Sequence, residues 1–382
     1  MNKLMNLVIL VIDALRQDGL TKSEQLKRFA KNASAIFPNT ISASSISVPS
    51  FASIHTGLYP PAHGLRYQKS GALGQVPTLA GKMVDKGFRT MACAYTVAVS
   101  PLRRTNRGFQ EYINLNRTSG ALFGQQYWNN MCEWWEKKRN EPSYLFLHTL
   151  ACHSPYDGKN FTSWDTHAEV KKRINALPRE EYIQKYWNAV DEVFQFLVEP
   201  MIDYILSIRP DTRIFILSDH GELLLDAPNE WSLATPGTWI PHIINFVRGK
   251  KSLISHGNSL EDMLVKVPLI TINTPQINSS DKIKRTVDIV PTIMELIGED
   301  SSGFNGYTLT NEFAPEIAYA ELMDRKIFRI TTPMETHVMR YGDKIPQKFE
   351  SFMKGIKEIT QTKLGEEEEK EVKKRLRELG YL

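Results

Sequence analysis

The chain has 382 residues, of which 42% are hydrophobic and 24% are charged, an ordinary composition for a globular protein. This length allows one large α/β domain with a smaller appendage. The net charge of +4 is too small to indicate a nucleic-acid-binding protein, and no run of Lys and Arg carries the interleaved aromatic residues that such binding would show.

Apolar, β-branched runs alternate along the chain with amphipathic stretches of helical period. The predicted strands, in chain order, are residues 7–12, 88–95, 144–149, 213–218, 240–247 and 267–272. The predicted helices are residues 21–35, 76–86, 125–139 and 179–207, followed by a short helix at 287–296. This alternation predicts an α/β fold with a doubly wound, mostly parallel sheet flanked by helices. After residue 300 the pattern weakens, which indicates a small C-terminal α+β subdomain.

Polar side chains follow two of the predicted strands. Asp13 comes directly after the first strand, and Asp219 and His220 come directly after the strand at 213–218. Because ligands gather at the carboxyl ends of strands in open α/β sheets, these side chains should share one edge. Two carboxylates, a His and a hydroxyl from the Ser-rich segment 42–50 suit a divalent cation and a nucleophile. The pattern predicts metal-assisted ester chemistry, although either Asp alone is also explained as a helix cap.

An ordered set of motifs spans nearly the whole chain. They are VIDALRQD (11–18), SVPSF (47–51) with Thr56-Gly57, GLYPPAHGLR (57–66), RGFQEY (107–112), HSPY (153–156), SDHGE (218–222), HGNSLEDMLVKVPLI (256–270), VDIVPTIMELIG (287–298) and RLRELGYL (375–382). In this order they resemble the sulfatase branch of the alkaline phosphatase superfamily. The resemblance implies an alkaline phosphatase-like fold and a hydrolase of sulfuric or phosphoric esters.

The resemblance also implies a metal centre. It assigns Asp13, Ser47, Asp219 and His220 to one divalent ion, which is Ca²⁺, Mn²⁺, Mg²⁺ or Zn²⁺. Many sulfatases have a second Asp where this chain has Ala14, and the loss of that ligand tilts the expectation away from Ca²⁺.

Ser47 stands at the nucleophile position of the resemblance. In true sulfatases this residue is a Cys or Ser converted to formylglycine, and an Arg four positions later belongs to the recognition motif for the conversion. Phe51 replaces that Arg here, so we expect an unmodified Ser47. The alternative is that Ser47 only serves a loop or a helix cap.

His153 and His256 match the His-x-Pro and His-Gly elements of the family. In two-metal relatives such histidines bind a second ion together with an Asp, and this chain has Thr149 at the place of that Asp. Two neutral imidazoles alone suit Mg²⁺ or Ca²⁺ poorly, so we expect one metal. His153 and His256 are then predicted to be catalytic, binding anionic oxygens or protonating the leaving group. The alternative for isolated histidines is a structural role. The resemblance implies that His63-Gly64 is a structural turn, and both His55 and His63 are expected to lie outside the site.

The sequence therefore predicts a sulfatase-like, metal-dependent hydrolase of sulfate or phosphate esters with Ser47 as the metal-activated nucleophile. The expected substrate is a small molecule or a glycan or lipid ester, with no nucleic acid as partner. Two alternatives remain open. One is a phosphodiesterase or phosphoglycerol-type transferase with an unmodified serine, and the other is a non-catalytic descendant that binds anions.

Two domains are expected: a catalytic domain over 1–300, with an insertion at 223–255 near the site, and a subdomain over 301–382 that ends in a charged helix. The three cysteines are scattered and odd in number, which favours a reducing compartment. The apolar run at 7–12 is too short for a signal peptide, and no stretch approaches the ~20 apolar residues of a membrane span. We expect a cytoplasmic protein.

Overall fold

The computed structural model describes residues 5–95, 98–114, 125–153, 156, 177–224, 256–359 and 362–378. The predicted strand at 240–247 lies outside these residues, and so does the expected insertion from residue 225 to its end.

An eight-stranded sheet forms the centre of the molecule, in the order β4-β3-β5-β1-β6-β7-β2-β8. The strand β7 is antiparallel to β6 and β2, and the other neighbours are parallel. The predicted α/β class with a mostly parallel sheet is confirmed. The strands are β1 (Leu7–Ile12), β2 (Ala35–Ile41), β3 (Arg89–Ala94), β4 (Glu111–Asn114), β5 (Ser143–Thr149), β6 (Arg213–Leu217), β7 (Lys266–Ile272) and β8 (Lys284–Arg285).

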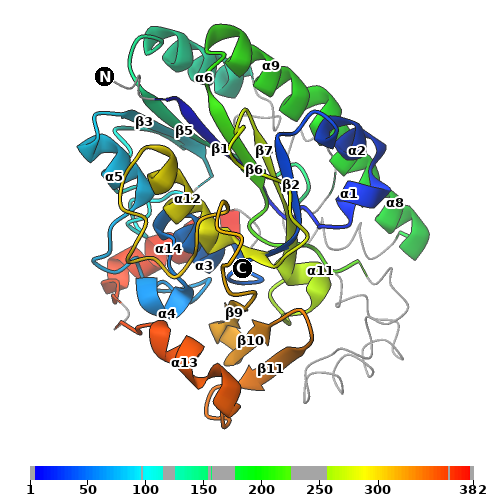
Figure 1. Cartoon of the computed structure of the whole chain (residues 1–382), viewed down its shortest axis with the longest axis vertical. Coiled ribbons are helices and arrows are strands. Elements are labelled where there is room, and N and C mark those ends of the chain that lie inside the picture. Colours follow the sequence, from blue (N-terminus) through cyan, green and yellow to red (C-terminus); the bar gives the residue numbers. More distant parts are fainter. Residues whose placement is uncertain are drawn as a thin grey trace.

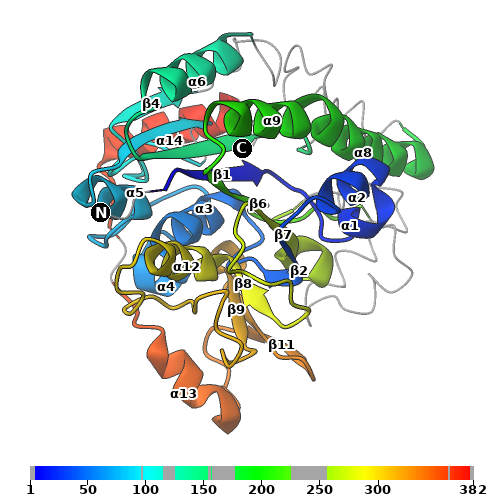
Figure 2. The ribbon, with the colours of Figure 1, turned by 45° about the horizontal axis from the view of Figure 1, so that its top comes forward.

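Helices cover both faces of this sheet. Figure 2 shows α6 and α9 along one face and α3 and α12 along the other, as a doubly wound fold requires. A π-helical segment, Phe194–Val198, joins α8 to α9. The helices are α1 (Gly19–Lys22), α2 (Glu24–Ala30), α3 (Ser47–Thr56), α4 (Pro60–His63), α5 (Leu79–Asp85), α6 (Gln125–Lys137), α8 (Arg179–Val193), α9 (Glu199–Ile208), α11 (Asp262–Val265), α12 (Ile289–Leu296), α13 (Gln347–Gly355) and α14 (Glu366–Glu378). None of the described helices is long and apolar enough to span a membrane.

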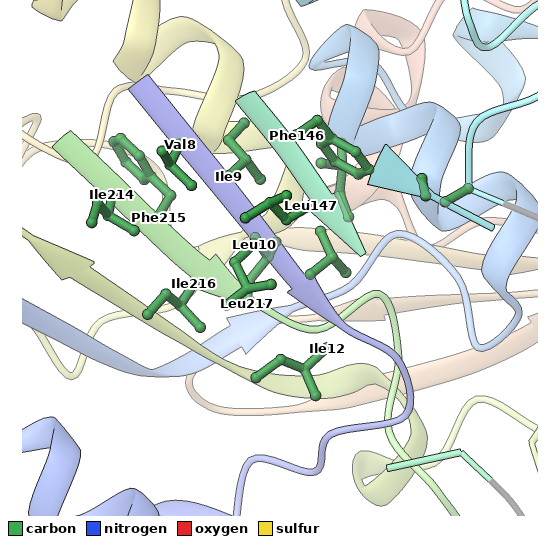
Figure 3. Packing of buried hydrophobic residues seen from close by; sticks show 14 of the residues in the cluster. Val8, Ile9, Leu10, Ile12, Phe146, Leu147, Ile214, Phe215, Ile216 and Leu217 are labelled. Carbon is green, nitrogen blue, oxygen red and sulfur yellow. The ribbon is translucent and has the colours of Figure 1, made fainter. Parts of the chain in front are cut away.

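The central strand β1 lies between β5 and β6, and all of its side chains are buried. Figure 3 shows side chains of these three strands packed together, among them Val8, Phe146 and Ile214. A strand that is covered on both faces must be apolar throughout, which explains the continuous run from Leu7 to Ile12. The first polar side chain after this run therefore appears where the strand ends.

The predicted helix at 21–35 is wrong at its C-terminal end. The structure ends α2 at Ala30, and β2 begins at Ala35. Pro38 interrupts the apolar pattern of this strand and cannot donate to a sheet ladder. The strand accommodates it with a shift of register between Phe37 and Thr40 in the pairing with β7.

A second, antiparallel sheet of three strands follows near the C-terminus (Figure 1). Its strands are β9 (Ala318–Leu322), β10 (Ile327–Thr331) and β11 (Thr336–Arg340). A buried ion pair joins it to the rest of the molecule, since Arg66 donates from Nε and Nη2 to the two carboxylate oxygens of Glu321, each at 2.8 Å. The expected C-terminal α+β subdomain is confirmed, and we propose the division near residue 300, between the described strands of the two sheets, as the domain boundary.

Candidate active site

The ends of β1 and β6 bring three polar side chains together. Asp13 follows β1, and Asp219 and His220 follow β6, which is its parallel neighbour. All three side chains are fully buried, and a ligand atom from each lies within 4.8 Å of the other two. The structure thus unites three of the four residues that the sequence assigned to a metal.

Ser47, the fourth of these residues, lies at the start of α3. Its Oγ atom is 3.0 Å from Nε2 of His220, so the hydroxyl lies beside the cluster. The adjacent backbone N–H, of Val48, donates to Oε1 of Gln68 at 3.1 Å. A helix N-terminus favours negative charge nearby, and this position therefore supports a serine that loses its proton.

His153 and His256 extend the cluster on the side of His220. The ring of His256 lies 4.2 Å from that of His220 and 5.2 Å from that of His153, between centroids. All six residues assigned to the site from the sequence therefore lie in one continuous group of contacts.

Glu222 is a site residue that sequence reasoning missed. Its buried carboxylate places Oε1 3.4 Å from Nδ1 of His256. Burial lowers the pKa of His256, but the negative charge of Glu222 and its hydrogen bond outweigh burial, and the pKa is raised overall. The signal in the sequence is that Glu222 ends the SDHGE motif, two residues after the predicted ligand His220.

The two buried carboxylates influence each other strongly. Burial and the charge of Asp13 raise the pKa of Asp219. Burial also raises the pKa of Asp13, but the hydrogen bond from His148 and the nearby charges of His153 and His220 act in the opposite direction and lower it overall.

The donor set fits a divalent cation. Oδ1 of Asp219 accepts a hydrogen bond from the backbone N–H of Ala14 at 3.3 Å, while Oδ2 accepts none from the residues that the structure describes. Two facing carboxylates, an imidazole and a hydroxyl are ligands that Mn²⁺, Mg²⁺ or Zn²⁺ accept. A cation between the carboxylates would also remove their mutual repulsion.

His148 is a second residue that sequence reasoning missed. It belongs to β5, is fully buried, and places Nε2 3.3 Å from Oδ2 of Asp13. A lone His in an apolar strand gives no sign from the sequence of which partner lies across the sheet. The one sign in the sequence is that His148 directly follows the apolar run from Tyr144 to Leu147.

His55 and His63 make their hydrogen bonds outside the cluster. Nε2 of His55 contacts the carbonyl oxygen of Ala98 at 3.1 Å. In His63, Nδ1 accepts the backbone N–H of Leu65 and Nε2 contacts Oγ of Ser53, both at 3.1 Å. These contacts agree with the expectation that both histidines lie outside the site.

The buried His63 should make folding stability depend on pH. Burial lowers its pKa to about 3, against 6.5 for an ordinary histidine. Below pH 6.5 the unfolded chain binds a proton that the folded chain refuses, so the free energy of unfolding should fall between pH 6.5 and 3 by about 1.4 kcal/mol per pH unit for this group. Urea unfolding from pH 7.5 to 5 measures the slope, and His63→Gln should reduce it by that amount. An equal slope in the variant would contradict the assignment.

A family model described as sulfatase matches residues 5–299. The chain belongs to the sulfatase family. Membership confirms the resemblance seen in the motifs and makes the protein a hydrolase of sulfuric or phosphoric ester bonds. No curated protein matches the chain in sequence.

Solved structures of low identity share the fold of this sulfatase-family chain. A Bacteroides thetaiotaomicron protein associated with the metabolism of multiple glycosaminoglycans has a TM-score of 0.64 at 14% identity. The similarity covers 99% of this chain and 97% of that protein. The phosphonate monoester hydrolase of Agrobacterium radiobacter has a TM-score of 0.64 at 13% identity, with 88% of each chain covered. An alkaline phosphatase superfamily protein from Vibrio parahaemolyticus has a TM-score of 0.57 at 18% identity, with 99% and 86% covered. These similarities confirm the alkaline phosphatase-like fold.

Proposed function

We propose that this sulfatase-family protein is a metal-dependent hydrolase of phosphate or sulfate esters that uses unmodified Ser47 as its nucleophile. Asp13, Ser47, Asp219 and His220 bind one divalent cation in this proposal. The observation that carries it is the approach of Ser47 Oγ to Nε2 of His220, at 3.0 Å, beside two buried carboxylates. In the part of the chain that the structure describes, one group of His, Cys, Asp and Glu is close enough to hold a metal, namely Asp13, Asp219 and His220. This favours a single ion.

The chemistry that a bound cation supplies is a lower pKa for the serine hydroxyl and polarisation of an ester oxygen. Ser47 loses its hydroxyl proton to solvent, and Oγ attacks phosphorus or sulfur in line with the leaving alcohol. A covalent ester with Ser47 forms as the bond to that alcohol breaks. Water then hydrolyses this ester and restores the serine. If a sugar or lipid hydroxyl takes the place of water, the same site acts as a transferase.

The leaving alcohol needs a proton, and we assign its delivery to His256. Glu222 contacts Nδ1 of this ring, and the buried carboxylate stabilises the protonated form. The contact with Glu222 therefore suits His256 to act as a general acid. His153 packs against the same ring and is assigned to the anionic oxygens of the substrate.

One observation favours phosphate over sulfate esters. Phe51 stands in place of the Arg of the formylglycine motif, and its side chain is fully buried against Phe146 and His148. The structural neighbours include two phosphonate monoester hydrolases, at 13% and 17% identity, and a 2-O glycosaminoglycan sulfatase, at 15% identity, so they do not decide between the two ester classes.

The test is a set of initial rates on matched aryl sulfate, aryl phosphate and diaryl phosphate esters, with and without added Mn²⁺. We expect turnover of a phosphate ester that is lost in EDTA and restored by the metal. The peptide that contains residue 47 should have the mass of unmodified serine. Sulfate turnover by a chain that carries formylglycine would overturn the assignment of the nucleophile.

Asp219→Asn should abolish metal binding while the chain stays folded. The substitution keeps the size of the side chain and removes a charged ligand, so the affinity for Mn²⁺ should fall by more than the roughly 100-fold that loss of an outer contact costs. Isothermal titration calorimetry measures this affinity. Asp211→Asn is the matched control, because Asp211 is a carboxylate before β6 that contacts Asn6 instead of the cluster. Equal affinities in Asp219→Asn and wild type would contradict the proposed site.

A further inference from the structure

Two neighbouring residues of β5 hold Asp13 from one side. His148 pairs with Val11 in the register of β1 and β5, and Asp13 lies two residues beyond Val11, so its side chain points to the same face. The imidazole Nε2 is 3.3 Å from Oδ2 of Asp13. The carbonyl oxygen of Thr149 accepts the backbone N–H of Asp13 at 2.9 Å. Both the main chain and the carboxylate of Asp13 are thereby tied to β5.

Two aromatic rings hold the imidazole of His148 in place. Phe51 lies edge-on at 4.6 Å and Tyr95 at 5.6 Å, between ring centroids. Nδ1 of His148 is buried and has no hydrogen-bond partner among the described residues. We assign the His148 tautomer that carries its proton on Nε2, because this N–H can donate to Asp13. Nδ1 then keeps a lone pair, beside the rings of Phe51 and Tyr95.

The helix α3 contacts both His220 and His148. Ser47 and Phe51 are four residues apart, so they lie one turn from each other on the same face of the helix. Ser47 meets His220, and Phe51 meets His148. The helix that carries the proposed nucleophile also supports the ring that holds Asp13.

We propose that His148 is a positioning residue for Asp13. Its Nε2–H holds Oδ2, so that Oδ1 faces the other ligands, and that atom lies 3.9 Å from Nε2 of His220. This inference rests on the proposed metal-binding role of Asp13 and adds a residue that acts through it. Outer contacts of this kind orient a metal ligand, and their loss typically costs about 10- to 100-fold in metal affinity.

The experiment is a calorimetric titration of the full chain, first stripped with EDTA, with Mn²⁺ alone. His148→Phe keeps a ring between Phe51 and Tyr95 but removes the donor, and should weaken Mn²⁺ binding by about 10- to 100-fold. His148→Gln restores an N–H donor near the position of Nε2 and should recover most of the affinity. Tyr144→Phe is the matched control, because it removes another buried polar atom from β5 that has no described partner, and it should bind Mn²⁺ as wild type does.

The outcomes separate this inference from the proposed function. If wild type binds Mn²⁺ and Asp219→Asn does not, while His148→Phe binds as tightly as wild type, the positioning role is overturned and the metal site stands. If wild type itself does not bind, the proposed function fails. Thermal unfolding of each variant in EDTA checks the fold. Should His148→Phe not fold, His148→Gln decides: affinity close to that of wild type supports the role of the donor, and a loss as large as that in Asp219→Asn overturns it.

Discussion

Ser47→Ala is expected to lower ester turnover by at least about 10³-fold while leaving the protein folded, because removal of a nucleophile is among the largest single losses in enzymes. The cost to folding should be small. The substitution removes one hydrogen bond, to His220, which is worth about 1 kcal/mol. Initial rates with the best ester found for wild type measure the effect, and mass spectrometry should detect a covalent adduct on wild type alone.

Ser53→Ala is the control that separates chemistry from structure in this test. Ser53 lies in the same helix, is equally buried, and makes the same kind of contact, from Oγ to Nε2 of His63 at 3.1 Å. It lies outside the cluster of carboxylates and should leave turnover unchanged. Retained activity in Ser47→Ala, or an equal loss in both variants, would refute the assignment of Ser47 as nucleophile.

Phe51→Arg is expected to destabilise the protein by about 4 kcal/mol or more, without creating sulfatase activity. The substitution introduces the residue that the formylglycine motif requires. Phe51 is fully buried, however, and its ring packs against Phe146 and His148. A guanidinium there loses its hydration and displaces the ring that supports His148. Urea unfolding at neutral pH measures the change in the free energy of unfolding.

Phe51→Leu gives the comparison, because it reduces volume without adding charge. It should cost less than the roughly 3–5 kcal/mol of a change from Phe to Ala, because most of the buried volume is kept. If Phe51→Arg proved as stable as wild type, the expected cost of burying a guanidinium at this position would be wrong.

The parts of the site that follow from local sequence were predictable. Asp13 and Asp219 end apolar strands, and a buried parallel strand can release a polar side chain only at its end. The apolar pattern also predicted the strands β1, β3, β5, β6 and β7, but not β2, because Pro38 inside that strand gives a loop signal. The bulge that resolves this conflict exists only once β2 pairs with β7.

The contacts that were missed depend on pairing between distant segments. His148 reads as a strand residue, and only the register of β5 against β1 makes it a neighbour of Asp13, 135 residues earlier. Glu222 stands two residues from a predicted ligand, yet its partner His256 lies 34 positions away. Composition and periodicity carry no information about such partners. The motifs defined the cluster itself, and the fold supplied the residues that support it.

The central place of β1 also has a consequence for synthesis. The strand β1 leaves the ribosome well before its two neighbours in the sheet, β5 and β6. His148 and Asp219 are separated from their contacts on the β1 segment by 135 and 205 residues. Such non-local pairing is slow, and an open apolar edge invites aggregation. A nascent chain that ends before β6 already carries the proposed nucleophile, Ser47, but lacks Asp219 and His220, two of the proposed metal ligands. Under the proposed function, metal uptake is therefore a late event in the maturation of this protein, and it reports that β6 has joined the sheet.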